Sequence, residues 1–454
     1  MLFSELKTAL KGRVLLPEDD FYAGSVKLWN AAIHTHPAII VRCEDSSDVT
    51  TAVRIARKYN WNLTVKGGGH DWSGLALSED GIVIDMSGMR GVKIDTEKKE
   101  ATIEGGVTAG DLLTAADPFG LVAVTGAGST IGMAGLTMGG GYGPLTPKYG
   151  LALDNLISAV IVLADGQMLT ASETEHRDLF WALKGGGGNF GVVVSMRVRL
   201  YDAHTVLSAL LLFPMSHAGP VLQYYNECAR SAPDELSLIT GIVPAAGAGH
   251  AVTVALTWCG DIETGERFFA DLQPAGKPFS AQVQRMKYKD LLSVFDTFVI
   301  QDHYNDMKTR WLPDLTAKAL SIILKAAAEM TSPLSTVSLQ YFYGAPARVP
   351  LHSTAFGLRQ PHILVLITST WRPEDDKSSA IHQKWSKDLC DDLAAQALPG
   401  GYANVLTPKE PDQVLFAHGE NLAELQRVKD SFDPERIFTS YPIGLLAPAR
   451  EKIR

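Results

Sequence analysis

The sequence predicts an α+β protein of two domains, the first made of two small lobes and the second of an antiparallel sheet covered on one face by helices. Between residues 38 and 200, short strands alternate with helices and glycine-rich loops. After Tyr201 the strand-like runs lengthen and alternate with helical stretches, which is typical of a helix-covered antiparallel sheet. A chain of 454 residues is long enough for both. We place the domains at 1–203 and 204–399, followed by a closing segment at 400–454.

The first lobe begins with a predicted β-α-β unit. Residues 38–43 predict one strand and residues 62–65 the next, with a helix between them whose apolar positions include Val49 and Val53. The run 46–48 supplies the polar side chains that cap this helix. Further strands are expected in the same lobe at 81–85 and 101–107, and another helix opens at 108–111.

The second lobe runs from about 121 to 200 and contains predicted strands at 159–164 and 192–198. In the second domain, strands are predicted at 206–212, 237–243, 251–258, 336–343 and 363–370. Helices are predicted there near 217–231, 262–273, 313–330 and 375–395. The Ala/Gly-rich run 245–249 is interpreted as a turn.

Charge and composition narrow the function classes. A formal net charge of −9 gives no basic surface for nucleic acid, and no run approaches the about 18 apolar residues of a membrane span. The first residues carry Glu5 and Lys7 where a secretory signal needs an apolar run. The four cysteines lack CxxC or metal-ligand spacing, so we expect reduced thiols, no bound metal and a cytoplasmic protein.

A glycine-rich loop, Val65 to Gly74, is the most informative stretch. Gly67, Gly68 and Gly69 follow a predicted strand and allow the backbone to approach an anionic ligand closely. The loop lacks the Lys-Ser/Thr ending of a Walker motif and the spacing of a dinucleotide fingerprint. A kinase and a Rossmann domain that binds a nicotinamide cofactor are therefore both disfavoured. Taken alone, His70 in this loop is more often an ordinary loop histidine than a functional one.

Further motifs follow at Thr125–Gly132, Gly139–Leu145, Lys148–Asn155 and Lys184–Gly191. In this order and spacing they resemble the flavin domain of the vanillyl-alcohol oxidase superfamily, and within it the berberine-bridge-enzyme-like oxidases. The resemblance covers nearly the whole chain and implies an FAD-binding domain whose two lobes hold FAD between them. Residues 401–404 and 432–438 resemble the family's closing element, which implies that the chain returns to the FAD domain at its end.

The resemblance implies that His70 is bonded covalently to the 8α-methyl of the flavin. The position of a second, cysteinyl link in many relatives falls on Gly128, which has no nucleophile, so a single histidyl link is expected. Gly67 to Gly69 are expected to wrap the pyrophosphate, with Lys66 either neutralising its charge or solvated at a strand end. The complete expected cofactor set is Lys66, Gly67, Gly68, Gly69, His70, Asp71, Gly74, Gly126, Ser129, Thr130, Met133, Gly135, Gly139, Gly140, Asn155, Gly188 and Val192.

Four further members of this set have alternative interpretations. Asn155, together with Asp154, either contacts the flavin or organises a turn. The stretch from Gly188 to Val192 either lies near the adenine half of FAD or forms a glycine-rich hairpin. Met133 aligns with a family position that influences access of oxygen to the flavin, where a small valine accompanies oxidase behaviour. Methionine is flexible and fits neither pattern, so Met133 leaves oxidase and dehydrogenase both open.

The expected substrate residues lie on the strand 337–343. Period-2 alternation places Ser338, Gln340 and Phe342 on one face, which the resemblance directs toward the flavin. Gln340, Tyr402 and Asn404 are the candidate catalytic residues, although an ordinary sheet role is as plausible for any strand residue. No charged side chain lies on this face. The polar group 302–304 either supplies a general base or is an ordinary loop.

The predicted function is hydride transfer from a small cyclic or aromatic amine or alcohol to covalent FAD, with O2 as acceptor and H2O2 as product. One alternative is a sugar or alcohol dehydrogenase on the same scaffold, using another acceptor. An alternative of a different class is a catalytically silent flavin-binding protein. Monomer and homodimer both remain open.

Overall fold

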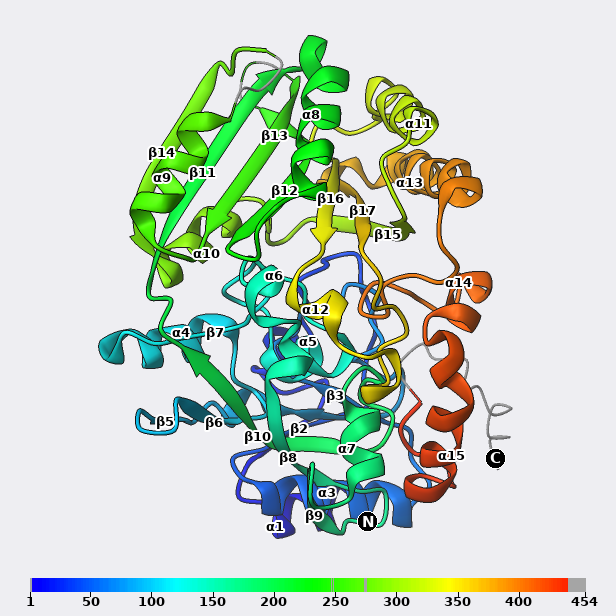
Figure 1. Cartoon of the computed structure of the whole chain (residues 1–454). Helices are drawn as coiled ribbons and strands as arrows, with labels where there is room; N and C mark the ends of the chain where they lie inside the picture. The colour runs from blue at the N-terminus through cyan, green and yellow to red at the C-terminus, as the bar shows by residue number, and fades with distance from the viewer. Residues whose placement is uncertain (1, 246, 248, 273–275, 440–454) are drawn as a thin grey trace.

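The computed structural model describes residues 2–245, 247, 249–272 and 276–439 (Figure 1). Its first lobe is a four-stranded sheet with strand order β1-β2-β4-β3. These strands are β1 (Arg13–Leu15), β2 (Ile39–Arg42), β3 (Leu63–Lys66) and β4 (Ile82–Asp85). Both β2 and β3 run parallel to β4, and helix α3 (Ser46–Lys58) connects β2 to β3. The predicted β-α-β unit is therefore confirmed, with β4 placed between its two strands.

The N-cap of α3 differs from the prediction by one residue. The cap is Asp45, whose carboxylate accepts hydrogen bonds from the backbone N–H groups of Ser47 and Asp48. Ser46 is already the first helical residue. The apolar positions Val49 and Val53 are buried in the core of the first lobe, as predicted.

The second lobe has a sheet with strand order β5-β6-β10-β8-β9, and β7 pairs with β10. Its strands are β5 (Val92–Asp95), β6 (Glu100–Glu104), β7 (Val122–Ala123), β8 (Leu156–Val162), β9 (Met168–Ser172) and β10 (Val192–Tyr201). Its helices include α4 (Ala109–Ala116), α5 (Met133–Gly139), α6 (Thr146–Tyr149) and α7 (Arg177–Leu183). The strand predicted at 101–107 belongs to this lobe and not to the first, because β6 pairs with β10, a partner about 95 residues later that local pattern does not reveal.

The second domain is a seven-stranded antiparallel sheet with order β14-β11-β13-β12-β16-β17-β15. Its strands are β11 (Thr205–Pro214), β12 (Leu236–Ala245), β13 (Gly249–Trp258), β14 (Ser280–Lys287), β15 (Tyr304–Leu312), β16 (Thr336–Phe342) and β17 (His362–Trp371). The helices whose side chains join the core of this domain are α8 (Ala218–Arg230), α9 (Ile262–Asp271), α11 (Ala317–Ala328) and α13 (Ser379–Leu393) (Figure 1). The predicted antiparallel sheet with helices on one face is therefore confirmed.

Among the described residues of this domain, two strands and two α-helices escaped prediction, one of the helices being the four-residue α12 (Ala345–Arg348). Strand β14 is an edge strand with mostly exposed polar residues, and β15 mixes charged and apolar residues, so neither shows clean alternation. Helix α10 (Tyr288–Asp296) lies between them. The predicted turn at 245–249 joins β12 and β13, with Ala245 paired to Gly249, while residues 246 and 248 lie outside the described residues.

The closing segment packs against both lobes of the first domain (Figure 1). Helix α14 (Pro411–Phe416) is followed by α15 (Leu422–Phe432), which contacts α7 and places Leu425 and Val428 in the core of the second lobe. Ile437 and Phe438 enter the core of the first lobe. This packing supports the discontinuous first domain that we propose. No helix in the described part of the chain has the length and apolarity needed to span a membrane.

Candidate active site

The glycine loop after β3 meets a glycine loop of the second lobe. A methyl group added at Gly68 would lie 2.5 Å from the backbone nitrogen of Gly132, so the two backbones touch where neither residue has a side chain. Gly69 has φ +71°, which a residue with a side chain adopts only under strain. Among the described residues, the N–H groups of Gly67, Gly68, Gly69 and His70 find no hydrogen-bond acceptor. Four consecutive unpaired N–H groups on partly exposed residues fit an anionic group such as a pyrophosphate.

His70 is held between the two lobes. Its Nε2 lies 2.7 Å from Oγ1 of Thr130, and its ring stacks on Trp29 with 5.5 Å between centroids and 14° between planes. Burial lowers the pKa of His70 to about 4, and the nearby charge of Asp296 opposes this shift only partly. The imidazole is therefore neutral at pH 7 and keeps a nitrogen lone pair available for bonding.

Trp29 is a site residue that sequence reasoning missed. Its backbone N–H donates to the carbonyl oxygen of Gly69 at 2.8 Å, which fixes it beside the loop. Its indole Nε1 is buried and has no hydrogen-bond partner within the described residues. Such an unpaired donor next to His70 fits a polar ligand atom at this point. No motif marks Trp29, because its contact with His70 depends on how the chain folds back.

Lys66 is buried beneath the loop. Its Nζ donates to the carbonyl oxygen of Ser25 at 2.6 Å and lies 3.3 Å from the carboxylate of Asp85, and the residue is only 8 % exposed. The solvated alternative for Lys66 is therefore wrong, because tertiary packing closes over the end of β3. The carboxylate of Asp85 balances the charge of Lys66 without any bound ligand.

Two further residues of the same loop shape it from within. The carboxylate of Asp71 accepts hydrogen bonds from Oγ and N–H of Ser73 and from N–H of Ala76. Gly74 has φ +85°, and a methyl group there would lie 2.9 Å from the side chain of Ile33. Both residues hold the loop in shape.

The second-lobe residues predicted to line the cofactor differ in their surroundings. Thr130 contacts His70, Ser129 is bonded to Asp296, and Gly135 on α5 is exposed with open space beside it. The residues that are closed off are Gly126, Met133, Gly139 and Gly140, all of them buried. Met133 is 1 % exposed and packs in the second-lobe core.

The open alternatives for Asn155 and Gly188 can be compared with their contacts. The Asn155 amide donates to the carbonyl oxygens of Tyr149 and Leu151 and accepts from the Tyr201 hydroxyl, which is the turn-organising arrangement. Gly188 is partly exposed with open space where a side chain would be, whereas Val192 is buried in β10.

Strand β16 presents the predicted faces. Val337, Leu339 and Tyr341 lie in the helix-covered core, while Ser338 and Gln340 are partly exposed on the opposite face. Phe342, predicted to contact substrate, is only 1 % exposed and stacks on His362 with 4.3 Å between ring centroids. It is part of an aromatic cluster and is closed to substrate in this structure, because residues from both domains cover it.

Tyr402 and Asn404 join the closing segment to α5. The hydroxyl oxygen of Tyr402 accepts hydrogen bonds from N–H of Gly141 at 3.0 Å and from the Asn404 amide at 2.9 Å. The Asn404 amide also reaches the carbonyl oxygen of Leu136 at 3.2 Å. Burial raises the pKa of Tyr402, so its phenol stays protonated at neutral pH and is a poor general base. Both residues are placed to position the glycine-rich end of α5.

The polar group at 302–304 has structural contacts. Nδ1 of His303 lies 2.7 Å from the carbonyl oxygen of Gln301, and the His303 carbonyl oxygen accepts from N–H of Ala31. The Tyr304 hydroxyl lies 3.3 Å from Nε2 of His34. These contacts favour the plain loop alternative. The described residues contain no cluster of His, Cys, Asp or Glu suited to a metal ion.

A buried pair, Tyr142 and His362, crosses between the domains. Nδ1 of His362 donates to the carbonyl oxygen of Gln360 at 2.8 Å, because a carbonyl can only accept. Its Nε2 therefore accepts from the Tyr142 hydroxyl at 2.9 Å. Burial lowers the pKa of His362 to about 3 and that of His418 to about 4. Both side chains are neutral in the folded protein.

We expect these two histidines to make the fold sensitive to acid. Their pKa values rise to about 6.5 on unfolding, so between about pH 6.5 and 4 the unfolded state binds more protons and stability falls as pH falls. The loss approaches about 3 kcal/mol per pH unit if both contribute fully. Melting temperatures measured from about pH 7.5 to 4.5 test this, with His362→Gln flattening the dependence and the surface replacement His36→Gln leaving it unchanged. Equal slopes for wild type and His362→Gln would contradict the assignment.

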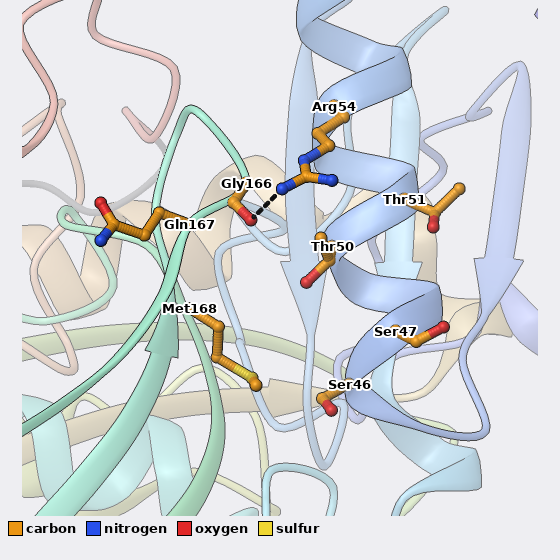
Figure 2. Close-up of a pocket in the computed structure, with 8 residues that line it drawn as sticks. All are labelled: Ser46, Ser47, Thr50, Thr51, Arg54, Gly166, Gln167 and Met168. Carbon is orange, nitrogen blue, oxygen red and sulfur yellow. Dashed lines mark hydrogen bonds between the residues drawn. The ribbon is translucent and has the colours of Figure 1, made fainter.

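A surface hollow elsewhere carries no catalytic group. It lies between α3 and the turn before β9 and is lined by small hydroxyl side chains and Arg54, whose Nη2 donates to the carbonyl oxygen of Gly166 at 3.2 Å (Figure 2). None of the predicted site residues lines it. The candidate active site is the region of His70, where the two glycine loops meet, and the partly exposed face of β16 is the candidate substrate face.

Comparisons with known proteins agree with this architecture. Residues 37–172 match the model of an FAD binding domain. The chain is 29 % identical to (R)-6-hydroxynicotine oxidase of Paenarthrobacter nicotinovorans, over 96 % of this chain and 97 % of that protein. The crystal structure of 6-hydroxy-D-nicotine oxidase from Arthrobacter nicotinovorans superposes with a TM-score of 0.83 at 27 % identity, over 95 % of this chain and 97 % of that one.

A second solved structure shares the fold but only a small part of the sequence. Berberine-bridge-enzyme-like protein 1 of Physcomitrella patens matches with a TM-score of 0.89 at 20 % identity, over 98 % of this chain and all of that one. At this identity the likeness concerns the fold alone. The FAD-binding domain and the likeness to an oxidase over nearly the full length of both chains together indicate the class of enzyme. The chain is an FAD-linked oxidoreductase that is similar over nearly its full length to (R)-6-hydroxynicotine oxidase, and it has the fold of the berberine-bridge-enzyme-like proteins.

Proposed function

We propose that the protein is an FAD-dependent oxidase that takes a hydride from a small cyclic or aromatic amine or alcohol, with FAD bonded covalently to His70 and O2 as the acceptor. The observation that carries this proposal is the neutral imidazole of His70, held at Nε2 by Thr130 beside four unpaired backbone N–H groups. The oxidase activity named for a relative 29 % identical over nearly the full length supports the reaction class.

The proposed roles follow from the contacts. The N–H groups of Gly67, Gly68 and Gly69 receive the pyrophosphate, and His70 anchors the flavin ring. When bound, FAD supplies the hydride acceptor. We propose that Ser338 and Gln340, the partly exposed polar residues of β16, orient the substrate. Tyr402 and Asn404 act through the end of α5 and not by proton transfer.

The substrate side of the proposal favours a neutral amine. Oxidation of an alcohol requires removal of the O–H proton as the hydride leaves, whereas a neutral amine can lose hydride without a base. The partly exposed face of β16 offers a hydroxyl and an amide, neither of which accepts a proton at neutral pH. Tyr402 of the closing segment keeps its own proton because burial raises its pKa.

The test is anaerobic mixing of the holoenzyme with a panel of cyclic amines and aromatic alcohols, followed by readmission of air. We expect the flavin absorbance to bleach with an amine of this class and to return in air with one equivalent of H2O2 per substrate. Bleaching without recovery in air, but with reduction of an artificial dye, would identify a dehydrogenase instead. A flavin that no compound bleaches would indicate the silent binding protein.

A further inference from the structure

A carboxylate on the second domain reaches into the site from a helix end. Asp296 is the last residue of α10, and its Oδ1 and Oδ2 accept hydrogen bonds from N–H of Ser129 at 2.8 Å and from the Ser129 hydroxyl at 2.5 Å. The negative end of the helix dipole disfavours a carboxylate at this position. The two hydrogen bonds from Ser129 therefore give Asp296 a stabilising partner that the helix itself does not.

The residue clamped by Asp296 is next to the one that holds His70. Thr130 follows Ser129 directly, and its Oγ1 lies 2.7 Å from Nε2 of His70. The same loop is held on its other side by α4, through hydrogen bonds from Gly110 to Ser129 and from Ala109 to Ile131. A continuous chain of contacts thus runs from Asp296 through Ser129 and Thr130 to the imidazole.

The charge of Asp296 also acts on His70 directly. It favours the protonated form of the imidazole, in opposition to the burial that favours the neutral one. Any step that makes the imidazole transiently cationic is therefore assisted by this carboxylate. Attachment of a carbon atom to a neutral imidazole nitrogen is such a step, until the other ring nitrogen releases its proton.

We propose that Asp296 is a positioning residue for covalent attachment of the flavin: it fixes Thr130 so that His70 presents Nδ1, and it stabilises the imidazolium that forms. This inference rests on the covalent link of the proposed function. In the attachment, Nδ1 bonds to the 8α carbon, and the carbon and the imidazole each lose one proton. The two protons and two electrons pass to the isoalloxazine ring, and O2 accepts them to give H2O2.

The test measures attachment separately from binding. Full-length protein produced flavin-free in a riboflavin-starved host is mixed with FAD, and the flavin that stays with acid-precipitated protein is followed over time. For Asp296→Asn we expect attachment to slow about 10-fold, the size expected when a charged hydrogen-bond acceptor is lost. Reversible FAD affinity, measured before attachment proceeds, should change less than about 2-fold, since this loop contact is not a direct ligand contact.

The matched control is Asp290→Asn, which removes an exposed carboxylate from the same helix and should attach flavin at the wild-type rate. Ser129→Ala removes one of the two hydrogen bonds to Asp296 and should slow attachment to an intermediate degree. This second variant tests the same contact if Asp296→Asn fails to fold. Equal rates for wild type and Asp296→Asn would overturn this inference alone. Wild-type protein that releases all flavin into acid would overturn both the tether and the inference.

Discussion

Alanine in place of His70 is expected to yield protein whose flavin is released completely by acid. The remaining contacts, the unpaired N–H groups of Gly67 to Gly69, would still bind FAD reversibly, because they do not depend on the imidazole. Without the tether the ring loses its fixed position against the substrate, and we expect turnover to fall about 10- to 100-fold. Absorbance of the acid supernatant and anaerobic bleaching rates measure the two effects.

The control for this change is His36→Ala, at an exposed histidine whose ring Nδ1 lies 4.0 Å from the carboxylate of Glu79. It should retain the wild-type fraction of bound flavin and the wild-type turnover. Protein with alanine at position 70 that still keeps its colour in the acid pellet would place the covalent link on another residue.

Methionine in place of Lys429 is expected to lower the free energy of unfolding by about 3–5 kcal/mol. Lys429 is 1 % exposed and lies in a buried ion pair with Asp433 at 2.5 Å. Its Nζ also donates to the carbonyl oxygens of Asn189 and Phe438. Removing the cation leaves the buried carboxylate without its counter-charge, although the N–H groups of Ile437 and Phe438 still donate to it. Calorimetry would show a melting temperature several degrees lower.

The same change should weaken FAD binding. Asn189 belongs to the glycine-rich stretch that is predicted to lie near the adenine half, and Lys429 ties it to α15. The control is Arg427→Met on the same helix, which breaks an exposed pair with Glu424 and should cost less than about 1 kcal/mol. Equal melting temperatures for the two variants would contradict the role given to the buried pair.

Local sequence predicted the elements better than it predicted their partners. The alternation of Ser338 and Gln340 against Leu339 and Tyr341 is confirmed, because the two faces of a strand follow from backbone geometry alone. The burial of Phe342 does not follow from the alternation, because it depends on Tyr142 from the first domain and on His362 from the neighbouring strand β17. Strand β6 was assigned to the wrong lobe for the same reason, since its partner β10 is remote in sequence.

For the candidate site, the glycine loops and His70 came from motifs, while their supports did not. Ser129 meets Asp296 across 167 residues, and Lys429 meets Asn189 across 240. Neither pair has a periodic or motif signal, because each forms only when separate elements pack together.

By itself, then, the sequence determined where backbone can approach a ligand, which faces of strands are apolar and which cofactor class the motifs suit. The tertiary structure alone decided that Lys66 is buried, that Trp29 stacks on His70 and that Asp296 clamps the loop beside it. The physical reason is that backbone conformation and amphipathicity are local properties of the chain. Burial, ion pairing and ring stacking are properties of surfaces that meet only after the whole core has formed.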